Sequence, residues 1–342
     1  DSAAIRPYFE LERVMRDGLF YVASELYGLS FRRRYDLPVY HPDVQLFEVL
    51  DADAAPLGLF LADYYARDGK QGGAWMSHFV TQSTLLAQRP VVVNCVNVAR
   101  PPSGEPALLT FEEVTTLFHE FGHALHGLLS RVSYPLLAGT NVPRDFVEYP
   151  SQFHEMWARE PNILARFARH NASGAPLPAA LLERILASQN FNQGYQTTEY
   201  LQAALIDQAW HELPLERCPG AHQVMEFETA TLAAFGTLLT AVPPRYHSPY
   251  FLHIFADDYS AGYYAYLWSE ILARDTGRWF RNHGGLSRSG GERFRVAILS
   301  RGWTQDTQQL FREFNGAPPD IEPLLEYRGL TAAPAVRNQA PA

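Results

Sequence analysis

The segment from Thr110 to His126, which reads TFEEVTTLFHEFGHALH, constrains the fold of this chain more than any other. Thr110 followed by Glu113 forms a capping box, so we expect a helix that begins at Phe111. His119 then lies about two turns into the helix, with His123 one turn further on the same face. We expect the apolar residues of the helix to pack against a core: Val114, Leu117, Phe121, Leu125 and Leu128.

The spacing of these histidines is typical of a zinc peptidase. Two imidazoles on one helical face can converge on a single tetrahedral ion. Glu120 lies about 100° round the helix from His119, within reach of a water molecule at the ion but not a ligand itself. Zinc makes water nucleophilic near neutral pH, and a carboxylate then takes its proton. His126 lies ~10 Å along the axis from His119, so we expect it behind the ligands or at the surface.

A zinc peptidase needs a third protein ligand, and the segment after this helix offers three candidates. They are Glu148, His154 and Glu155, and their spacing alone does not choose among them. Glu148 stands among aromatic residues, where a partly buried carboxylate requires a nearby cation. Asp145 is a candidate acceptor for the free N–H of a ligand histidine.

A second group of candidate site residues lies between His253 and Glu270. Tyr259, Tyr263 and Tyr266 are spaced at i, i+4 and i+7, which predicts three phenols on one face of a helix. Three hydroxyl groups on one face need hydrogen-bond partners, which a substrate cleft supplies. Phenols also suit a developing oxyanion, because they donate a hydrogen bond without carrying charge.

The rest of the sequence predicts a mainly α fold with one small β-sheet. Apolar spacing predicts a helix over 9–29. The segments 44–50 and 56–62 predict a hairpin, and 89–98 a third strand. We expect Arg32–Arg34 to form a solvated turn. We expect residues 1–330 to form one domain and residues 331–342, which are rich in Ala and Pro, to form a disordered tail.

Composition argues against several classes of function. The net charge of −9 disfavours nucleic-acid binding, which requires a basic face. No apolar run reaches the length of a membrane span. The two cysteines cannot build a disulfide framework, which favours a reducing compartment. We therefore expect a cytoplasmic monomer without nucleic-acid or membrane partners.

The motifs together resemble the M3 family of zinc peptidases, the thimet oligopeptidase and oligopeptidase A group. The resemblance extends from about Ile5 to Leu330 and is carried mainly by Phe118–Gly127, Gly139–Gln152 and Tyr259–Trp268. It implies a zincin-like metallopeptidase catalytic domain from which the family's N-terminal helical half is absent.

The resemblance also implies a role for each site residue. The metal ligands of one zinc ion would be His119, His123 and Glu148, with Glu120 as general base. Tyr266 would be the main oxyanion donor, and Tyr263, Tyr259 and His253 would support the substrate. Gly73 and Ala74 belong to a stretch that precedes the strand along which an extended peptide would lie.

We expect this chain to act on short, unstructured peptides and to release dipeptides from their C-terminal end. One alternative is an oligopeptidase that cleaves internally, and another is a catalytically incomplete fragment that binds zinc and peptide. Arg245 and Tyr246 are candidates for holding the terminal carboxylate of a substrate. Ala256-Asp257-Asp258 replaces the glycine-rich loop of relatives, which predicts a stiffer loop and added negative charge near the cleft.

Overall fold

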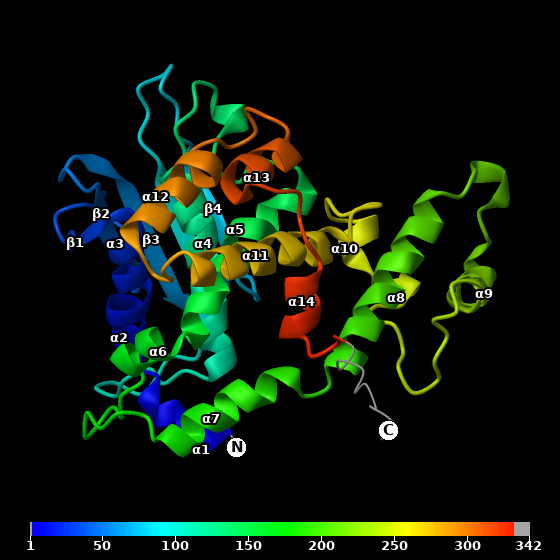
Figure 1. Cartoon of the computed structure of the whole chain (residues 1–342), viewed down its shortest axis with the longest axis horizontal. Coiled ribbons are helices and arrows are strands. Elements are labelled where there is room, and N and C mark those ends of the chain that lie inside the picture. The colour runs from blue at the N-terminus through cyan, green and yellow to red at the C-terminus, as the bar shows by residue number, and fades with distance from the viewer. Residues whose placement is uncertain (1, 332–342) are drawn as a thin grey trace, which may run out of the picture.

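The structure, a computed structural model, describes residues 2–331 and consists of successive packed layers (Figure 1). A β-sheet contacts α4 (Phe111–Leu128), α4 contacts α5 (Arg144–Arg159), and α5 contacts α11 (Ala265–Asn282). The predicted mainly α fold with one small sheet is therefore confirmed. Apart from Thr331, the tail predicted at 331–342 lies outside the described residues.

The sheet has five strands in the order β1-β2-β3-β5-β4, with β3 and β5 parallel and the other pairs antiparallel. The strands are β1 (Ser30–Arg33), β2 (Gln45–Leu50), β3 (Pro56–Tyr65), β4 (Trp75–Val80) and β5 (Val91–Val98). The predicted hairpin and third strand are confirmed as β2, β3 and β5. In the described part of the chain, β4 is an edge strand that pairs only with β5.

The solvated turn predicted for the arginine run is wrong for Arg32 and Arg33, which lie in β1. Arg32 stands opposite Glu48 of β2, and its Nε donates to the Glu48 carboxylate at 2.9 Å. Cross-strand pairing of opposite charges lets an edge strand carry arginines that local sequence assigns to a turn.

The helix predicted at 9–29 is a continuous rod from Leu11 to Tyr27 with a π-helical turn at Val14–Phe20. Gly28, in the left-handed conformation at φ +69°, ends it. The remaining helices are α1 (Ser2–Ile5), α2 (Leu11–Arg13), α3 (Tyr21–Tyr27), α6 (Pro161–Phe167), α7 (Ala179–Ala187), α8 (Gln193–His211), α9 (Val224–Ala234), α10 (Leu252–Phe255), α12 (Arg288–Phe294), α13 (Thr307–Asn315) and α14 (Glu322–Tyr327).

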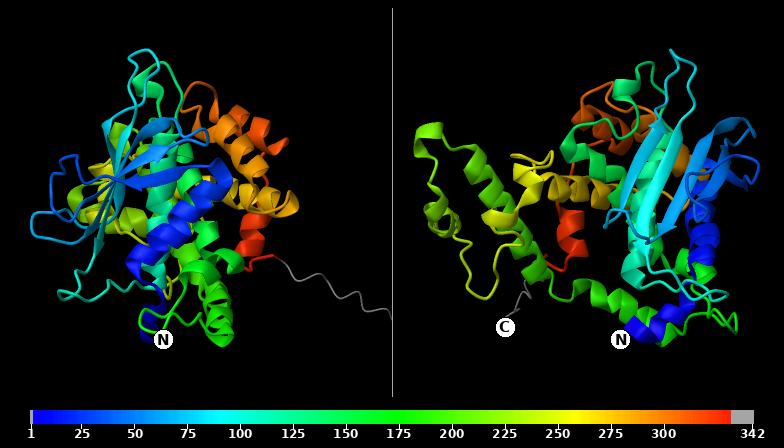
Figure 2. Two further views of the ribbon diagram at one scale, coloured as in Figure 1. Left: turned by 90° about the vertical axis from the view of Figure 1, so that its left-hand side faces the viewer. Right: turned by 180° about the vertical axis from the view of Figure 1, so that it is seen from behind.

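Helices α8 and α9 project to one side of the layers, on the side away from the sheet. Figure 1 and the right-hand view of Figure 2 both place α10 between the start of α11 and α8. The segment that carries the tyrosines thus lies where the layered body meets α8. Among residues 2–331, no helix combines the length and apolar character needed to cross a membrane.

Candidate active site

The helix that carries the paired histidines begins as the sequence predicts. The Glu113 backbone N–H donates to Thr110 Oγ1 at 3.1 Å, and the Thr110 N–H donates to Glu113 Oε2 at 2.7 Å. All members of the predicted core face are buried: Val114, Leu117, Phe121, Leu125 and Leu128. Asn94 of β5 donates to the carbonyl oxygen of Glu120 at 2.8 Å, which ties the helix to the sheet at the level of the site.

Helices α4 and α5 approach closely at Gly122. A Cβ atom there would lie 2.6 Å from the Cα of Ser151 and 2.9 Å from the Pro150 carbonyl oxygen, closer than real contacts allow. The two residues follow Glu148 by less than one helical turn. The missing side chain therefore lets α5 bring Glu148 to the histidines of α4.

Three side chains from these two helices converge on one point. Glu148 Oε2 lies 3.1 Å from Nε2 of His119 and 3.1 Å from Nε2 of His123. His119, His123 and Glu148 each offer one ligand atom, and these three atoms all lie within 4.8 Å of one another. Zinc–ligand bonds of about 2.1 Å give tetrahedron edges of roughly 3.4 Å. The donor set and its spacing therefore fit a zinc ion.

The other two candidates for the third ligand occupy different positions. His154 is buried, with Nδ1 2.6 Å from the Pro150 carbonyl oxygen and Nε2 2.9 Å from the Tyr27 hydroxyl. Burial lowers the pKa of His154 to about 4, so it is a neutral core residue. Glu155 Oε1 lies 2.7 Å from Nδ1 of His119, on the side of the imidazole that faces away from Glu148.

The structure does not bring Asp145 to either histidine. Its carboxylate accepts a hydrogen bond from the Tyr264 hydroxyl at 2.8 Å, and Glu155 takes the position expected of Asp145. Asp145 lies about one turn before Glu148 and meets Tyr264 just before α11, whereas Glu155 lies two full turns after Glu148 and meets Nδ1 of His119. Glu155 thus holds the His119 ring with Nε2 directed at Glu148, as a carboxylate behind a ligand histidine would.

His126 is fully buried, and neither of its ring nitrogens has a partner within the described residues. The surface position considered for it is therefore wrong. The helix is covered on this side by the sheet and by the 130–143 connection, since a Cβ atom on Gly139 would lie 3.0 Å from the Cα of Gly127. Burial lowers the pKa of His126 to about 3, which keeps the ring neutral.

The electrostatics of the convergent residues favour a cation. Burial opposes ionisation of Glu148, but the adjacent imidazoles of His123 and His119 hold its pKa well below the usual range. Glu120 is only 5% exposed, and its Oε2 has no hydrogen-bond partner among residues 2–331. Burial raises the pKa of Glu120, the change expected of a carboxylate that must accept a proton near neutral pH.

The three tyrosines cluster, but only Tyr266 lies on a helix, contrary to the prediction of three phenols on one helical face. Helix α11 begins only at Ala265, and Tyr259 and Tyr263 lie in turns before it. The Tyr259 and Tyr266 rings nevertheless stack at 5.2 Å, and the Tyr263 ring lies 5.8 Å from that of Tyr266. The Tyr259 hydroxyl is 3.4 Å from Glu148 Oε1, which joins the cluster to the candidate metal ligands. Burial and the neighbouring Tyr259 raise the pKa of Tyr266, so its proton stays available for donation.

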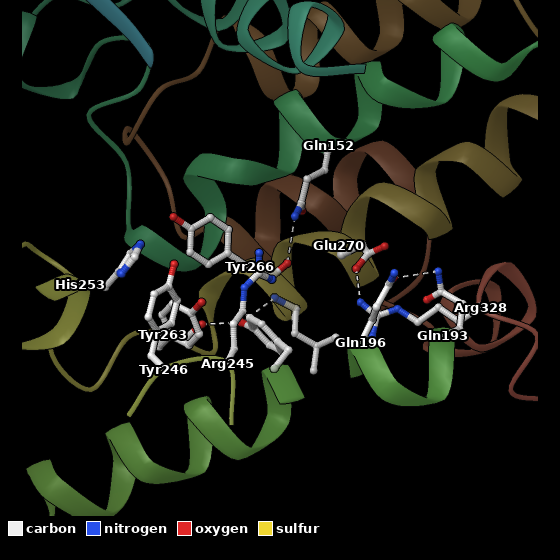
Figure 3. Close-up of a pocket in the computed structure, with 12 residues that line it drawn as sticks. Gln152, Gln193, Gln196, Arg245, Tyr246, His253, Tyr263, Tyr266, Glu270 and Arg328 are labelled. Atoms are coloured by element: carbon white, nitrogen blue, oxygen red, sulfur yellow. Dashed lines mark hydrogen bonds and ion pairs between the residues drawn. The ribbon is translucent and has the colours of Figure 1, made fainter. Parts of the chain in front are cut away.

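A cavity of about 390 Å³ opens beside the tyrosines (Figure 3). Its lining includes five residues predicted for the site: Arg245, Tyr246, His253, Tyr263 and Tyr266. Figure 3 also shows Glu270 and Arg328 at the opposite end, where they form an ion pair. Arg245, in contrast, forms no salt bridge within residues 2–331. The pocket therefore contains a guanidinium group that no carboxylate of residues 2–331 pairs at salt-bridge distance.

Gly73 and Ala74 lie immediately before the edge strand β4. Asn97 Nδ2 donates to the carbonyl oxygens of both Gln71 and Gly73 at 2.8 Å. The Lys70 side chain is buried and donates to the Val96 carbonyl oxygen at 2.6 Å and to Asp63 Oδ1 at 3.0 Å. These contacts fix the entrance to β4, and sequence reasoning missed Asn97 and Lys70 because isolated polar residues give no local signal of such bonds.

Comparisons with known proteins agree with the chemistry of this site. The sequence matches Peptidase family M3 over residues 1–330. It is 51% identical over 330 residues to a dipeptidyl carboxypeptidase of Escherichia coli (strain K12), which covers 96% of this chain and 48% of that protein. It is 40% identical over 333 residues to oligopeptidase A of the same strain, a match that covers 95% of this chain and 48% of that protein. The chain thus spans about half the length of the curated relatives it matches.

Among solved structures, a putative oligoendopeptidase F from Bacillus anthracis str. Ames covers 78% of this chain and 39% of that chain. Its TM-score is 0.46 and its sequence identity 14%, a likeness too weak to bear on the fold.

Proposed function

Because the chain belongs to peptidase family M3, we propose that it is the zincin-like catalytic part of a zinc metallopeptidase that acts on short, unstructured peptides. The proposed reaction is release of C-terminal dipeptides by a single monomeric domain, residues 1–330. The observation that carries the proposal is the convergence of His119, His123 and Glu148 beside the buried Glu120. The relative named dipeptidyl carboxypeptidase supports the exopeptidase assignment.

The residues of the site have complementary roles in this proposal. A zinc ion would supply the Lewis acid that activates water at neutral pH. Glu120 would accept the proton of the attacking water and pass it to the leaving amine. Tyr266 would donate a hydrogen bond to the oxygen of the scissile carbonyl as that oxygen gains charge, supported by Tyr263 and His253.

The substrate would lie extended along the free edge of β4, in the manner of an added strand. Gly73 and Ala74 stand at the start of that edge, and Tyr259 lies across the site beside Glu148. Asp258 forms a 3.0 Å ion pair with Arg144, whereas Asp257 is exposed without such a pair within residues 2–331. We therefore place the added negative charge of this loop on Asp257, where it would favour peptides with a nearby positive group.

Arg245 and Tyr246 are proposed to hold the terminal carboxylate of the substrate. Peptides with a free C-terminus should be cleaved faster than their amidated counterparts, because only the free acid offers a carboxylate to the guanidinium. Arg245→Gln should remove this preference by raising KM for free-acid peptides roughly 10- to 100-fold, the value of a charge-assisted hydrogen bond. Mass spectrometry of timed digests would measure both effects.

The exposed Arg217 offers a matched control, since Arg217→Gln changes the same charge outside the pocket. Equal cleavage of free and amidated peptides by the unmodified protein would contradict the exopeptidase assignment. The internal-cleaving alternative would then describe the reaction, and the relative named oligopeptidase A, at 40% identity, would become the more relevant comparison.

Replacement of Tyr266 by Phe should lower kcat by roughly two to three orders of magnitude, because the site loses a donor to the developing oxyanion. Zinc content and melting temperature should not change, since the ring still stacks on Tyr259. Tyr264→Phe is a matched control two positions away, as that hydroxyl contacts Asp145 outside the cluster. An unaltered kcat for Tyr266→Phe would remove this residue from the proposed role.

A further inference from the structure

The turns that carry Tyr259 and Tyr263 are held by side chains of a distant helix, α8. Both carboxylate oxygens of Asp207 accept backbone hydrogen bonds, from Ala261 N at 2.9 Å and from Tyr263 N at 2.8 Å. Gln208 Nε2 donates to the Ala261 carbonyl oxygen at 2.8 Å. Asp207 and Gln208 of α8 thus bind both the N–H and the carbonyl group of Ala261, and we call this set of contacts the clamp.

A third contact extends this clamp to the first turn of α11. The Tyr200 hydroxyl donates to the Tyr263 carbonyl oxygen and accepts from Leu267 N at 3.2 Å. The ring of Tyr200 also stacks on that of Tyr263 at 5.2 Å. Tyr264, at the N-cap of α11, makes no capping hydrogen bond with its side chain. The Tyr200 hydroxyl of α8 instead supplies an acceptor to the first turn of α11, as a capping side chain would.

The conformation of the turn requires such external support. Ala261 has φ +53°, in the left-handed region that residues with a Cβ atom rarely adopt. A strained backbone of this kind persists only where its surroundings determine it. Asp207 is fully buried, and its contacts are two backbone N–H groups and the imidazole of His211, whose Nδ1 lies 2.8 Å from Oδ1. Within residues 2–331 this buried carboxylate forms no ion pair with an arginine or lysine, and two of its contacts are with the backbone of this turn.

The position of the turn decides where the phenols stand relative to the metal ligands. Tyr259 and Tyr266 lie on either side of the clamped residues, and Tyr259 reaches Glu148 of α5. The metal ligands are carried by α4 and α5, whereas the turn is fixed from α8. The turn at 259–264 is therefore fixed from α8, while Tyr266 at the start of α11 is also held from α5, where Gln152 Nε2 donates to its carbonyl oxygen at 3.1 Å.

We propose that Asp207 is a positioning residue for the tyrosine cluster: its carboxylate sets the turn at 259–264 and so aims the phenols at the reacting carbonyl. This inference rests on the proposed peptidase function. Asp207 does not touch the substrate in this arrangement, and it acts through Tyr263 and Tyr266. Displacement of a catalytic group by about 1 Å can cost roughly 100-fold in rate.

The test is Asp207→Asn in the natural full-length chain. The amide keeps the shape of the side chain but offers one acceptor to two N–H groups, so the turn should loosen. We expect kcat for a zinc-dependent peptide hydrolysis to fall roughly 10- to 100-fold, with KM within about twofold and zinc content unchanged. Hydrogen exchange measured by mass spectrometry should accelerate in peptides covering 259–267 and not in those covering α4 or α5.

Two comparisons separate positioning from a general loss of stability. Asp275→Asn is the matched control, because Asp275 is also buried and also accepts a backbone N–H, that of Asp320, but lies far along α11 from the tyrosines. It should lower the melting temperature without lowering kcat. In a Tyr266→Phe background, Asp207→Asn should reduce kcat by a much smaller factor than in the unmodified protein, because both changes remove the same contribution.

Each outcome bears on a different statement. Unchanged kcat for Asp207→Asn in an active enzyme would overturn the inference and leave the proposed function intact, as would effects of Asp207→Asn and Tyr266→Phe that simply multiply. Absence of zinc-dependent hydrolysis by the unmodified protein would instead overturn the proposed function. The exchange experiment would still report in that case whether Asp207 holds the turn, since it needs no activity.

Discussion

Glu120→Gln is expected to lower peptide hydrolysis by roughly 10²- to 10⁴-fold while zinc remains bound. The amide has the size of the carboxylate but cannot accept a proton, so water at the metal position loses its base. Glu120 is buried beside the histidines without contributing to the convergent ligand atoms, so the substitution should leave the ligand set intact. Initial rates on a defined peptide, together with elemental analysis of the purified protein, would measure both quantities.

Glu112 lies exposed on the same helix, and Glu112→Gln serves as the matched control, which should retain full activity. Turnover that is the same in Glu120→Gln and in the unmodified protein would point to a contaminating peptidase. It would also contradict the assignment of Glu120 as general base.

The second large effect is expected from His119→Ala, which should abolish both zinc binding and hydrolysis. The ion would join α4 to α5, so its loss should also lower the melting temperature. With free zinc at 100 times its dissociation constant, binding stabilises the folded state by about 2.7 kcal/mol, and that stabilisation disappears with the ligand. Elemental analysis and thermal melts with and without added zinc would test this.

His222→Ala provides the control, because His222 is exposed and far from the site in sequence. Its melting temperature should rise with added zinc as that of the unmodified protein does. A chelator should lower the melting temperature of the unmodified protein but not that of His119→Ala. Full zinc occupancy in His119→Ala would show that other side chains hold the ion.

The features that local rules determine could be predicted from the sequence. The capping box at Thr110 and Glu113 depends on residues three positions apart, and the structure has both of its hydrogen bonds. The placement of His119 and His123 on one face follows from helical periodicity alone. Glu148 could not be chosen from spacing, because its approach depends on the contact of α4 with α5 at Gly122, which only the fold or a family resemblance reveals.

The predictions that were wrong concern features that depend on contacts between distant segments. The tyrosine spacing predicted a helix from 259 onward, but Asp207 and Gln208 of α8 hold Ala261 in a left-handed turn instead. Asp207 itself looks like an ordinary solvated position in the α8 sequence. Glu155 was considered only as a metal ligand, since nothing local shows that its carboxylate would meet the far side of the His119 ring.

Gly122 does not belong to the candidate ligands, yet its lack of a side chain should affect how tightly the site binds a metal ion. A single methyl group added there should push α4 and α5 apart and move Glu148 away from His119 and His123. The same methyl group at Gly194 of α8 would meet nothing within 4 Å. Metal affinity at this site should therefore depend on volume in the protein interior, and not only on the chemistry of the ligands.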